Sequence, residues 1–436
     1  MLTCYLLSAA VWIPIFGRLG DARGKKRMLV VALAMLTLGS LIAAQAASLP
    51  VMLAARVVQG AGAGVLPLSF GIVRDEVPPA EVPGTIGVIS ALSGVGAGLG
   101  IVLAGPIVEH LGYHWLFWLP MVVTAAAALG TWLLVPESPV TSPSKINWAA
   151  ALLLSCWLVA LLLAVSQAPQ WGWLTPRVLA LIALAAVGAV FWARGEARSP
   201  YPLVDMGVMR LRSVWTNNAV AFGLGVIMYV SFSFVPIFVE TQRSPGYGLG
   251  VSVTVAGLMV LPQTMSVFVM GSLAAPLARR FGTKTLLVSA PLFAVAAFTL
   301  LAFSYRHAWE IYLATGVLGI GVGLAFSTSS SLLAAAVPAQ HTGVALGMNA
   351  NIRTVGGAIG SAAMTSVILV GASAGKPPLE SGFSHGFGML AAVGALCVIA
   401  AALVPATGRR QASIPITYPG RMSASSATDS TSSGEV

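Results

Sequence analysis

The sequence predicts an all-α integral membrane protein, and three observations lead to that fold class. Of the 436 residues, 57% are hydrophobic and only 8% are charged, and the mean hydropathy is +0.89. A typical soluble domain has about 25% charged residues, so this chain cannot cover a soluble surface. The apolar residues form runs of about 20 residues, the length that a helix needs to cross the hydrocarbon core. These runs lack the alternation of apolar and polar residues that a membrane barrel requires.

Each expected span is a run with at most one charged residue. Short segments that contain charged residues, glycine or proline separate one run from the next. The 13 expected spans, in order, are 2–16, 28–47, 53–73, 84–107, 115–135, 148–165, 178–193, 214–239, 251–277, 285–303, 309–335, 342–370 and 386–404.

An internal repeat divides these spans into two sets. The segment Gly24–Val30 is similar to Gly282–Val288, 258 residues later. Two homologous halves with a substrate site between them are common in secondary transporters. Further residues match at a shift of 259: Gly62 with Gly321, Gly64 with Gly323, Pro79 with Pro338, Gly84 with Gly343, and Gly98 with Gly357.

The repeat and the composition together predict four regions. An N-terminal transmembrane half covers residues 1–135, and a C-terminal transmembrane half covers 213–406. Residues 136–212 contain two linking spans without a counterpart in the repeat, followed by a cytoplasmic connector. Residues 407–436 are rich in Ser, Thr and Gly and are expected to form a disordered cytoplasmic tail.

The distribution of Lys and Arg predicts the orientation. With residues 17–27 placed inside, the alternating loops put 17 basic residues inside and 4 outside, and the remaining 2 of the 23 lie within spans. Loops rich in Lys and Arg face the cytoplasm. We therefore expect a multi-pass protein of the cytoplasmic membrane, with a cytoplasmic C-terminus and with Met1 outside.

Several function classes are not expected. The net charge of +10 does not indicate nucleic-acid binding, because the basic residues lie in short loops and not on one soluble face. The phosphate-binding pattern Gly-x4-Gly-Lys-Ser/Thr is absent, so ATP is not the expected energy source. We find no metal-ligand spacing, no nucleophile constellation and no paired carboxylates at depth, so neither a metal, a cofactor nor an enzyme is expected.

Four segments resemble motifs of a known transporter family. The segment Gly17–Arg27, a tight basic loop between two spans, resembles the signature loop of the major facilitator superfamily. Within the 14-helix drug:proton antiporter branch of that family, Arg56–Ala63 resembles the fourth-helix motif. Ser166–Trp173 resembles the outer loop between the two extra helices, and Pro202–Asp205 resembles the connector into the second half.

The resemblance implies the major facilitator fold, with two six-helix halves and two extra linking helices. Because the first span here corresponds to the family's second helix, the first half is expected to lack the family's first helix. Either translation begins upstream of Met1, or the protein is a variant with one helix fewer.

The resemblance also implies a function. The protein would be a monomer that exports lipophilic small molecules or drugs by alternating access, with inward proton flow as the energy source. Two other hypotheses stay open. One is a dedicated exporter of one endogenous metabolite on the same fold, and the other is a truncated non-transporting remnant or sensor.

The resemblance implies that the signature loop is a conformational latch on the cytoplasmic side. Its glycines permit close helix contact, and Asp21 can accept hydrogen bonds from a helix N-terminus or pair with a cation. The resemblance also implies that Lys25 reaches Asp75, and the alternative is a plain positive-inside anchor. The expected latch residues are Gly17, Gly20, Asp21, Arg23, Gly24, Lys25, Lys26 and Asp75.

Two arginines lie within spans, where a guanidinium usually faces a cavity or a partner. Arg56 shares a helix face with Gln59 at i+3, and Arg353 shares one with Asn349 at i−4. The resemblance implies that Arg56 takes part in proton coupling, with snorkelling to the outer interface as the alternative. Arg353 is expected to line a cavity for substrate or for a coupling carboxylate. Asn217 and Gln263 are expected either to bind cargo or to join helices.

The glycines of the 84–107 span lie where antiporters of this family carry a Gly-Pro motif. Close helix packing and a specific antiport role both stay open for the set Gly94, Gly98, Gly100, Gly105 and Pro106. No acidic residue lies in the middle of any expected span. The candidate proton carriers are therefore Glu109, beside His110, and an acid on the absent first helix.

Overall fold

Helices account for nearly all of the residues that the structure describes, and no strand occurs among them. The structure is a computed structural model that describes residues 2–78, 81–137, 147–200, 202–242, 247–337, 342–370 and 378–405. These residues belong to one unit, Met1–Pro405. The predicted tail at 407–436 lies outside the described residues.

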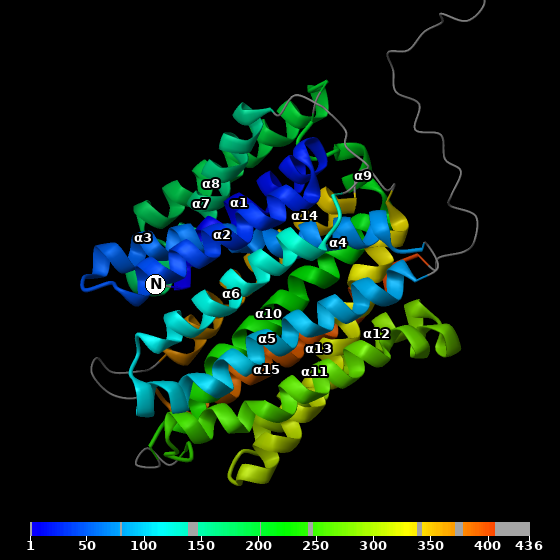
Figure 1. The fold of residues 1–436 in the computed structure, drawn as a ribbon. Helices are drawn as coiled ribbons and strands as arrows, with labels where there is room; N and C mark the ends of the chain where they lie inside the picture. Colours follow the sequence, from blue (N-terminus) through cyan, green and yellow to red (C-terminus); the bar gives the residue numbers. More distant parts are fainter. Residues whose placement is uncertain are drawn as a thin grey trace, which may run out of the picture. The chain divides into compact units, whose positions relative to one another are not determined.

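The helices follow one another in an up-and-down order (Figure 1). The first half contains α1 (Leu2–Arg23), α2 (Lys25–Ala44), α3 (Leu49–Gln59), the 3-10 helix η1 (Gly60–Gly64), α4 (Val65–Glu76), α5 (Val82–Leu111) and α6 (Trp115–Leu134). The linking region contains α7 (Trp148–Trp171), α8 (Pro176–Arg198) and the short α9 (Met206–Arg210). The second half contains α10 (Arg212–Glu240), α11 (Val253–Phe281), α12 (Thr283–Phe303), α13 (Ala308–Ala336), α14 (Thr342–Ile368) and α15 (Glu380–Leu403).

Every predicted span coincides with helix. The span at 53–73 consists of three pieces, because the alternating glycines of η1 tighten the helix between α3 and α4. Among the described residues, 11 helical segments are long and apolar enough to cross a membrane, and α1 and α14 complete the set of 13. The predicted all-α membrane fold is confirmed.

The helix boundaries repeat as the sequence does. Between the two halves, the first residues of corresponding helices differ by 258 to 260 positions: Lys25 of α2 and Thr283 of α12, Leu49 of α3 and Ala308 of α13, Val82 of α5 and Thr342 of α14. By the same shift α1 corresponds to α11, and α6 corresponds to α15. The described first half contains no counterpart of α10.

The repeat relates the contacts that join the halves. Helix α1 packs against α14, and α5 packs against α11. Since α1 corresponds to α11 and α5 to α14, exchanging the halves converts the first contact into the second. We call these contacts the α1–α14 seam and the α5–α11 seam. In addition, α4 packs against α14, and α5 packs against α13.

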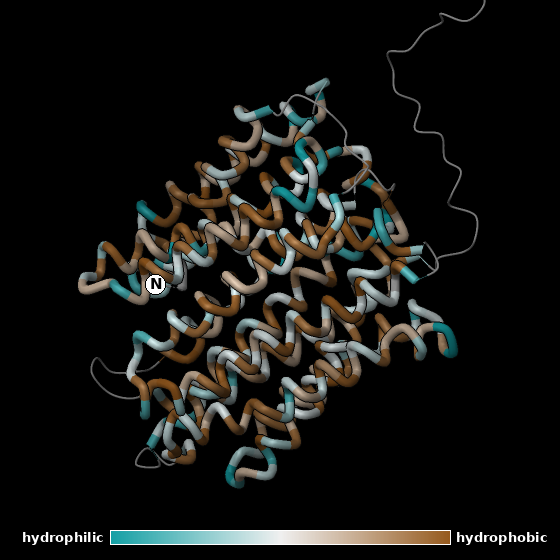
Figure 2. Tube along the Cα trace, in the orientation of Figure 1, coloured by the Kyte–Doolittle hydropathy of each residue, from teal (hydrophilic) through white to brown (hydrophobic). Residues whose placement is uncertain are grey.

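Hydrophobic residues predominate along the helices (Figure 2), and many large ones are exposed. Leu134, Leu174 and Phe303 are 83%, 86% and 85% exposed, respectively. A soluble protein rarely exposes so much apolar surface, whereas lipid solvates it well.

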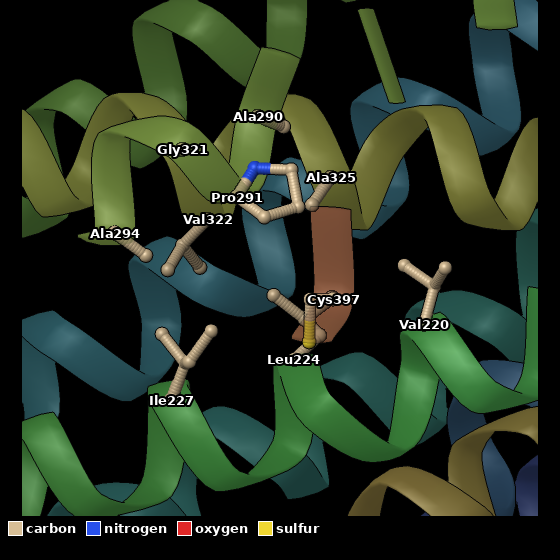
Figure 3. Close-up of a pocket in the computed structure, with 10 residues that line it drawn as sticks. All are labelled: Val220, Leu224, Ile227, Ala290, Pro291, Ala294, Gly321, Val322, Ala325 and Cys397. Carbon is tan, nitrogen blue, oxygen red and sulfur yellow. The ribbon is translucent and has the colours of Figure 1, made fainter. Parts of the chain in front are cut away.

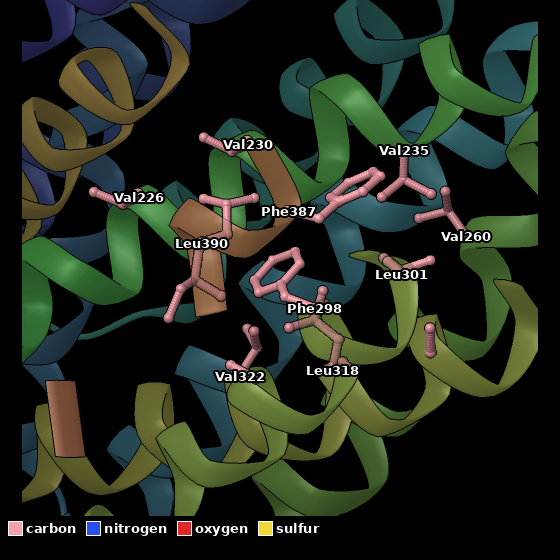
Figure 4. Close-up of a cluster of buried hydrophobic side chains, with 14 of the residues drawn as sticks. Val226, Val230, Val235, Val260, Phe298, Leu301, Leu318, Val322, Phe387 and Leu390 are labelled. Atoms are coloured by element: carbon pink, nitrogen blue, oxygen red, sulfur yellow. The ribbon is translucent and has the colours of Figure 1, made fainter. Parts of the chain in front are cut away.

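The largest buried apolar cluster lies in the second half (Figure 4). Phe298, Leu318 and Leu390 are fully buried within it and come from α12, α13 and α15. Phe238 of α10 contacts the rings of Phe383 and Phe387 at centroid distances of 5.1 and 5.5 Å. Because α10 brings its side chains between α13 and α15, it completes the core of this half.

Candidate functional site

A buried charge cluster lies at the end of the first half that carries residues 17–27, here called the inner end. The Lys25 Nζ atom is 2.7 Å from Asp75 Oδ2 and 3.6 Å from Asp21 Oδ1. All three side chains are at most 6% exposed. The structure therefore brings together Lys25 and Asp75, as the resemblance implied, and adds Asp21 to the same cluster.

The glycines around the cluster permit this close packing. Gly24 joins α1 to α2 with φ 102°, a conformation that L side chains rarely adopt. A Cβ atom at Gly20 would lie 2.4 Å from a methyl group of Leu68, and one at Gly17 would contact the backbone of Gly343.

Two of the expected latch residues lie outside the cluster. Arg23 is exposed, and neither Arg23 nor Lys26 forms an ion pair among the described residues. Arg23 follows Asp21 by two positions, which places it on the opposite side of α1. Among the described residues neither of these two basic residues adds an ion pair to the cluster, and their role in the latch stays a prediction.

The Asp21 carboxylate lies against the second half. A Cβ atom at Gly343, the second residue of α14, would be 3.5 Å from Asp21 Oδ1. The N-terminus of a helix carries a partial positive charge, which favours a carboxylate there. Asp21 therefore places a negative charge of the first half at the positive end of a helix in the second half.

Arg74 makes the complementary contact, and the sequence reasoning missed it. Its guanidinium donates hydrogen bonds to the carbonyl oxygens of Ala334 and Val337, the latter at 2.8 Å. These carbonyls lie at the C-terminus of α13, where a cation is favoured. The position of Arg74 beside Asp75, at the inner end of a span, was the available signal.

Arg56 belongs to a polar chain inside the first half. Its Nη1 donates to Gln59 Oε1 at 3.2 Å, and Gln59 Nε2 donates to Ser40 Oγ of α2 at 2.9 Å. The guanidinium carbon lies 4.9 Å from the ring centroid of Phe117 on α6. The expected pairing of Arg56 with Gln59 on one helix face is present.

Arg353 is buried deep in the second half. The residue is 8% exposed, and its guanidinium carbon lies 4.2 Å from the ring centroid of Phe326 on α13. Asn349 bonds to Asn218 of α10 at 2.9 Å, so it joins two helices and not the arginine. Within the described residues, neither Arg353 nor Arg56 forms an ion pair with a carboxylate.

The other expected polar residues join helices. The Asn217 amide donates to the Ser329 carbonyl of α13 at 3.0 Å, and the Gln263 amide donates to Ser231 of α10 at 2.9 Å. The amide oxygens of Asn217 and Gln263 are buried without a hydrogen-bond partner among the described residues. Each side chain therefore keeps an acceptor while it connects two helices.

Three of the expected packing glycines form the α5–α11 seam. Added Cβ atoms at Gly94, Gly98 and Gly105 would lie 2.6, 1.8 and 2.7 Å from atoms of Val267, Thr264 and Thr254. All three partners belong to α11, so small residues allow this close approach.

Gly100 does not share this role. Among the described residues, no atom outside its own helix segment lies within 4 Å of a Cβ atom placed there, so the structure gives Gly100 no packing contact. It lies on another face of α5 from Gly98. Pro106 stands inside α5, which continues to Leu111.

A small cavity within the second half does not fit a cargo site. Val220, Ile227, Val322 and Cys397 are among its lining residues, which are apolar throughout (Figure 3). Its volume is about 10 Å³, close to the space of one water molecule. In the described part of the chain, no group of three His, Cys, Asp or Glu side chains is arranged to hold a metal ion.

Two repeated helical halves, joined at paired seams, define a multi-pass membrane transporter. The family model described as "Major Facilitator Superfamily" matches residues 1–361 and also residues 219–417. The chain belongs to the Major Facilitator Superfamily.

Several bacterial relatives are transporters by name. "Multidrug resistance protein Stp" of Mycobacterium tuberculosis is 28% identical over 377 residues, covering 86% of this chain and 69% of that protein. "Probable actinorhodin transporter" of Streptomyces coelicolor is also 28% identical, covering 90% and 69%. "Multidrug efflux pump LfrA" of Mycolicibacterium smegmatis is 26% identical, covering 92% and 80%.

Solved structures show the same fold. The human organic anion transporter MFSD10 (TETRAN) superposes with a TM-score of 0.66 at 17% identity, covering 92% of this chain and 82% of that one. The nucleoside transporter NupG gives a TM-score of 0.56 at 15% identity, covering 92% and 89%.

Proposed function

We propose that this protein exports lipophilic small molecules across the cytoplasmic membrane by alternating access. One observation carries the proposal: charges of the first half cap helix ends of the second half at the inner end. Asp21 lies at the N-terminus of α14, and Arg74 binds the C-terminus of α13. These contacts hold the inner ends together, so uptake of cargo from the cytoplasm requires them to break.

The paired seams support the same proposal. A rocking motion between two halves needs interfaces that can slide without unfolding either half. The α5–α11 seam is lined by Gly94, Gly98 and Gly105, whose lack of side chains leaves few interlocking groups. The names of the bacterial relatives, which include multidrug and antibiotic transporters, support small molecules as cargo.

We propose proton antiport as the energy source. The sequence has no ATP-binding pattern. Arg56 and Arg353 place positive charges within spans, where they can interact electrostatically with a proton or with cargo. Glu109 and His110, both exposed near the end of α5, are the candidate carriers within this chain.

A dedicated exporter of one endogenous metabolite is the second candidate function. The observation that favours it is the relative named "Probable actinorhodin transporter", which is as similar to this chain as the relative named for multidrug resistance. A dedicated exporter would respond to one compound among many, whereas a multidrug exporter would respond to several unrelated ones.

The experiment is transport in proteoliposomes that contain the purified full chain. An imposed proton gradient is expected to drive ethidium movement, with counterflow of protons reported by an internal pH dye. Nigericin, which collapses the gradient, is the control. Gradient-driven movement of ethidium and other unrelated dyes supports multidrug export. Movement of none of them, with the protein folded, contradicts it and leaves the dedicated exporter to be tested with metabolite extracts.

A further inference from the structure

A cavity of about 300 Å³ lies at the outer end of the α1–α14 seam, on the side covered by α7. Four helices contribute to its wall: Leu6 comes from α1, Leu162 from α7, Tyr229 from α10 and Ala362 from α14. The cavity is thus bounded by both halves and by a helix outside the repeat. Its volume is at the lower end of the range for drug-sized ligands.

The equivalent place in the other seam is closed. At the outer end of the α5–α11 seam, a Cβ atom at Gly105 would lie 2.7 Å from the backbone of Thr254. The shift of 259 residues that pairs Gly98 with Gly357 relates Gly105 to Met364, whose neighbour Thr365 lines the cavity. The two seams are related by the repeat, but the α5–α11 seam is tightly packed at its outer end, whereas the α1–α14 seam contains the cavity.

The wall of this cavity combines apolar surface with hydroxyl and amide groups. Ser166 and Gln170 of α7, Ser361 and Thr365 of α14 and the Tyr229 phenol supply the polar groups. None of the described residues that line it is charged. Such a wall suits a neutral molecule with an apolar body and several hydrogen-bonding groups.

Ser166 is the most informative of these groups. Its hydroxyl is buried and has no hydrogen-bond partner in the described part of the chain. By contrast, Ser155 on the same helix donates to the Ala151 carbonyl at 2.7 Å, which is the usual arrangement within a helix. A buried hydroxyl without a partner is costly, and a rotation of the Ser166 side chain toward the cavity that this residue lines would let a bound ligand supply the partner.

The wall contributed by α7 is held in place from the adjoining loop. Trp173 Nε1 donates a hydrogen bond to Ser366 Oγ of α14 at 2.8 Å. Ser166, Pro169 and Gln170 line the cavity, and with Trp173 they belong to the segment 166–173 that stood out in the sequence. This segment therefore builds one wall of the cavity and fixes that wall to the second half.

We propose that this cavity binds neutral amphipathic small molecules, with the hydroxyl of Ser166 as one hydrogen-bonding partner. The proposal rests on the proposed export function only for its choice of small molecules as ligands. Binding here would place a ligand at the outer seam, against the linking helix and away from Arg353.

Equilibrium binding of tritiated chloramphenicol to the purified full chain in detergent micelles tests this. Chloramphenicol is neutral and carries an aromatic ring, an amide and two hydroxyls. We expect saturable binding that Ala358→Leu, which fills the cavity, weakens by about tenfold or more. Ser166→Ala and Ser361→Ala keep the cavity open and are expected to weaken binding by about threefold each. Ala186→Leu, at an exposed position of α8, is the matched control and is expected to change nothing.

No saturable binding, or binding that Ala358→Leu, Ser166→Ala and Ser361→Ala all leave unchanged, would overturn the proposal. Displacement of chloramphenicol by added phosphatidylglycerol would also overturn it, because the cavity would then belong to a lipid. The binding measurement needs neither a gradient nor transport. Its outcome is therefore independent of the proteoliposome experiment, and either proposal can fail alone.

Discussion

The two halves share one helical plan but differ in how completely they are packed. In the second half, α10 lies against α13, α14 and α15. The described first half has no helix in the corresponding place. In the most apolar 18-residue stretch of α6, 11% of the residues are buried, compared with 33% in that of α15. The same difference appears along α5, where Val88, Leu92, Leu99 and Leu103 are exposed.

The halves also contribute different groups to the contact at the inner end. The second half has the larger core and offers helix ends at the inner end, namely the C-terminus of α13 and the N-terminus of α14. The first half supplies the charged side chains, Asp21 and Arg74, that meet those ends. In the described part of the chain, the second half is therefore the more firmly packed body, and the first half carries the charged side chains of the inner contact.

The largest expected effect comes from breaking the seam between the halves at Gly98. A Cβ atom there would lie 1.8 Å from Thr264 Oγ1, and overpacking costs about 1–3 kcal/mol. We expect Gly98→Val to lower efflux by about 100-fold. Gly100→Val, on the same helix with nothing within 4 Å, is the matched control and should keep most of the activity. Similar losses in both variants would show that helix propensity, and not the seam, is responsible.

The next largest effect is expected from the two arginines within spans, and the comparison is between the losses of efflux that Arg353→Ala and Arg56→Ala cause. Arg353 is buried over Phe326, whereas Arg56 is only half-buried, and a desolvated cation–π contact is worth about 2 kcal/mol. We expect Arg353→Ala to lower efflux by about 30-fold with normal membrane insertion, and Arg56→Ala to lower it by about threefold. Arg353→Lys should recover part of the activity, because it keeps the charge but loses the planar stack. Full activity of Arg353→Ala in the efflux assay would remove this residue from the mechanism.

The inner latch is expected to affect rate more than affinity. Asp21→Asn removes a charge at a helix N-terminus, a contact worth about 1 kcal/mol, so we expect turnover to change by about fivefold. Because the latch acts on the conformational step, turnover should fall while the apparent affinity for ethidium stays the same. Glu76→Gln, an exposed carboxylate next to Asp75, serves as the control. An unchanged rate for Asp21→Asn, or an equal loss in both variants, would contradict the latch.

Long apolar runs, the repeat and helical spacing were enough to predict most of the fold. The 13 spans and the pairing of Arg56 with Gln59 depend on local sequence, where solvation by lipid and the helical period decide the outcome. The contact between Lys25 and Asp75 followed from the family resemblance, because it joins residues 50 positions apart.

The missed features depend on which helix faces lie against each other. Arg74 reaches carbonyls about 260 residues away, and no local pattern specifies that partner. Gly100 and Gly98 look alike in sequence, but only the face that contains Gly98 lies against α11. Asn349 shares a face with Arg353, but its amide donates a hydrogen bond to Asn218 of α10 and not to the arginine.

The smallest expected effect tests the firmness of the second half at its outer end. Tyr305, in the loop between α12 and α13, donates a hydrogen bond to the Glu380 carboxylate at the start of α15. Burial, together with this hydrogen bond, raises the pKa of Tyr305 from 10.0 to about 12. The pKa of the Tyr305 phenol is higher in the folded protein than in the unfolded chain. Its contribution to the stability of the folded state is therefore fully present below about pH 10 and is lost as the pH rises through 12.

We therefore expect Tyr305→Phe to lower the melting temperature by about 2 °C, by the same amount at every pH from 6 to 9. Ethidium efflux should be unchanged, because the contact lies within one half and crosses neither seam. Thermal unfolding of the purified variant, followed by tryptophan fluorescence across that pH range, measures the difference. A loss of efflux without a loss of stability would mean that the outer end of the second half moves during transport, and the second half would then not be the firmer body.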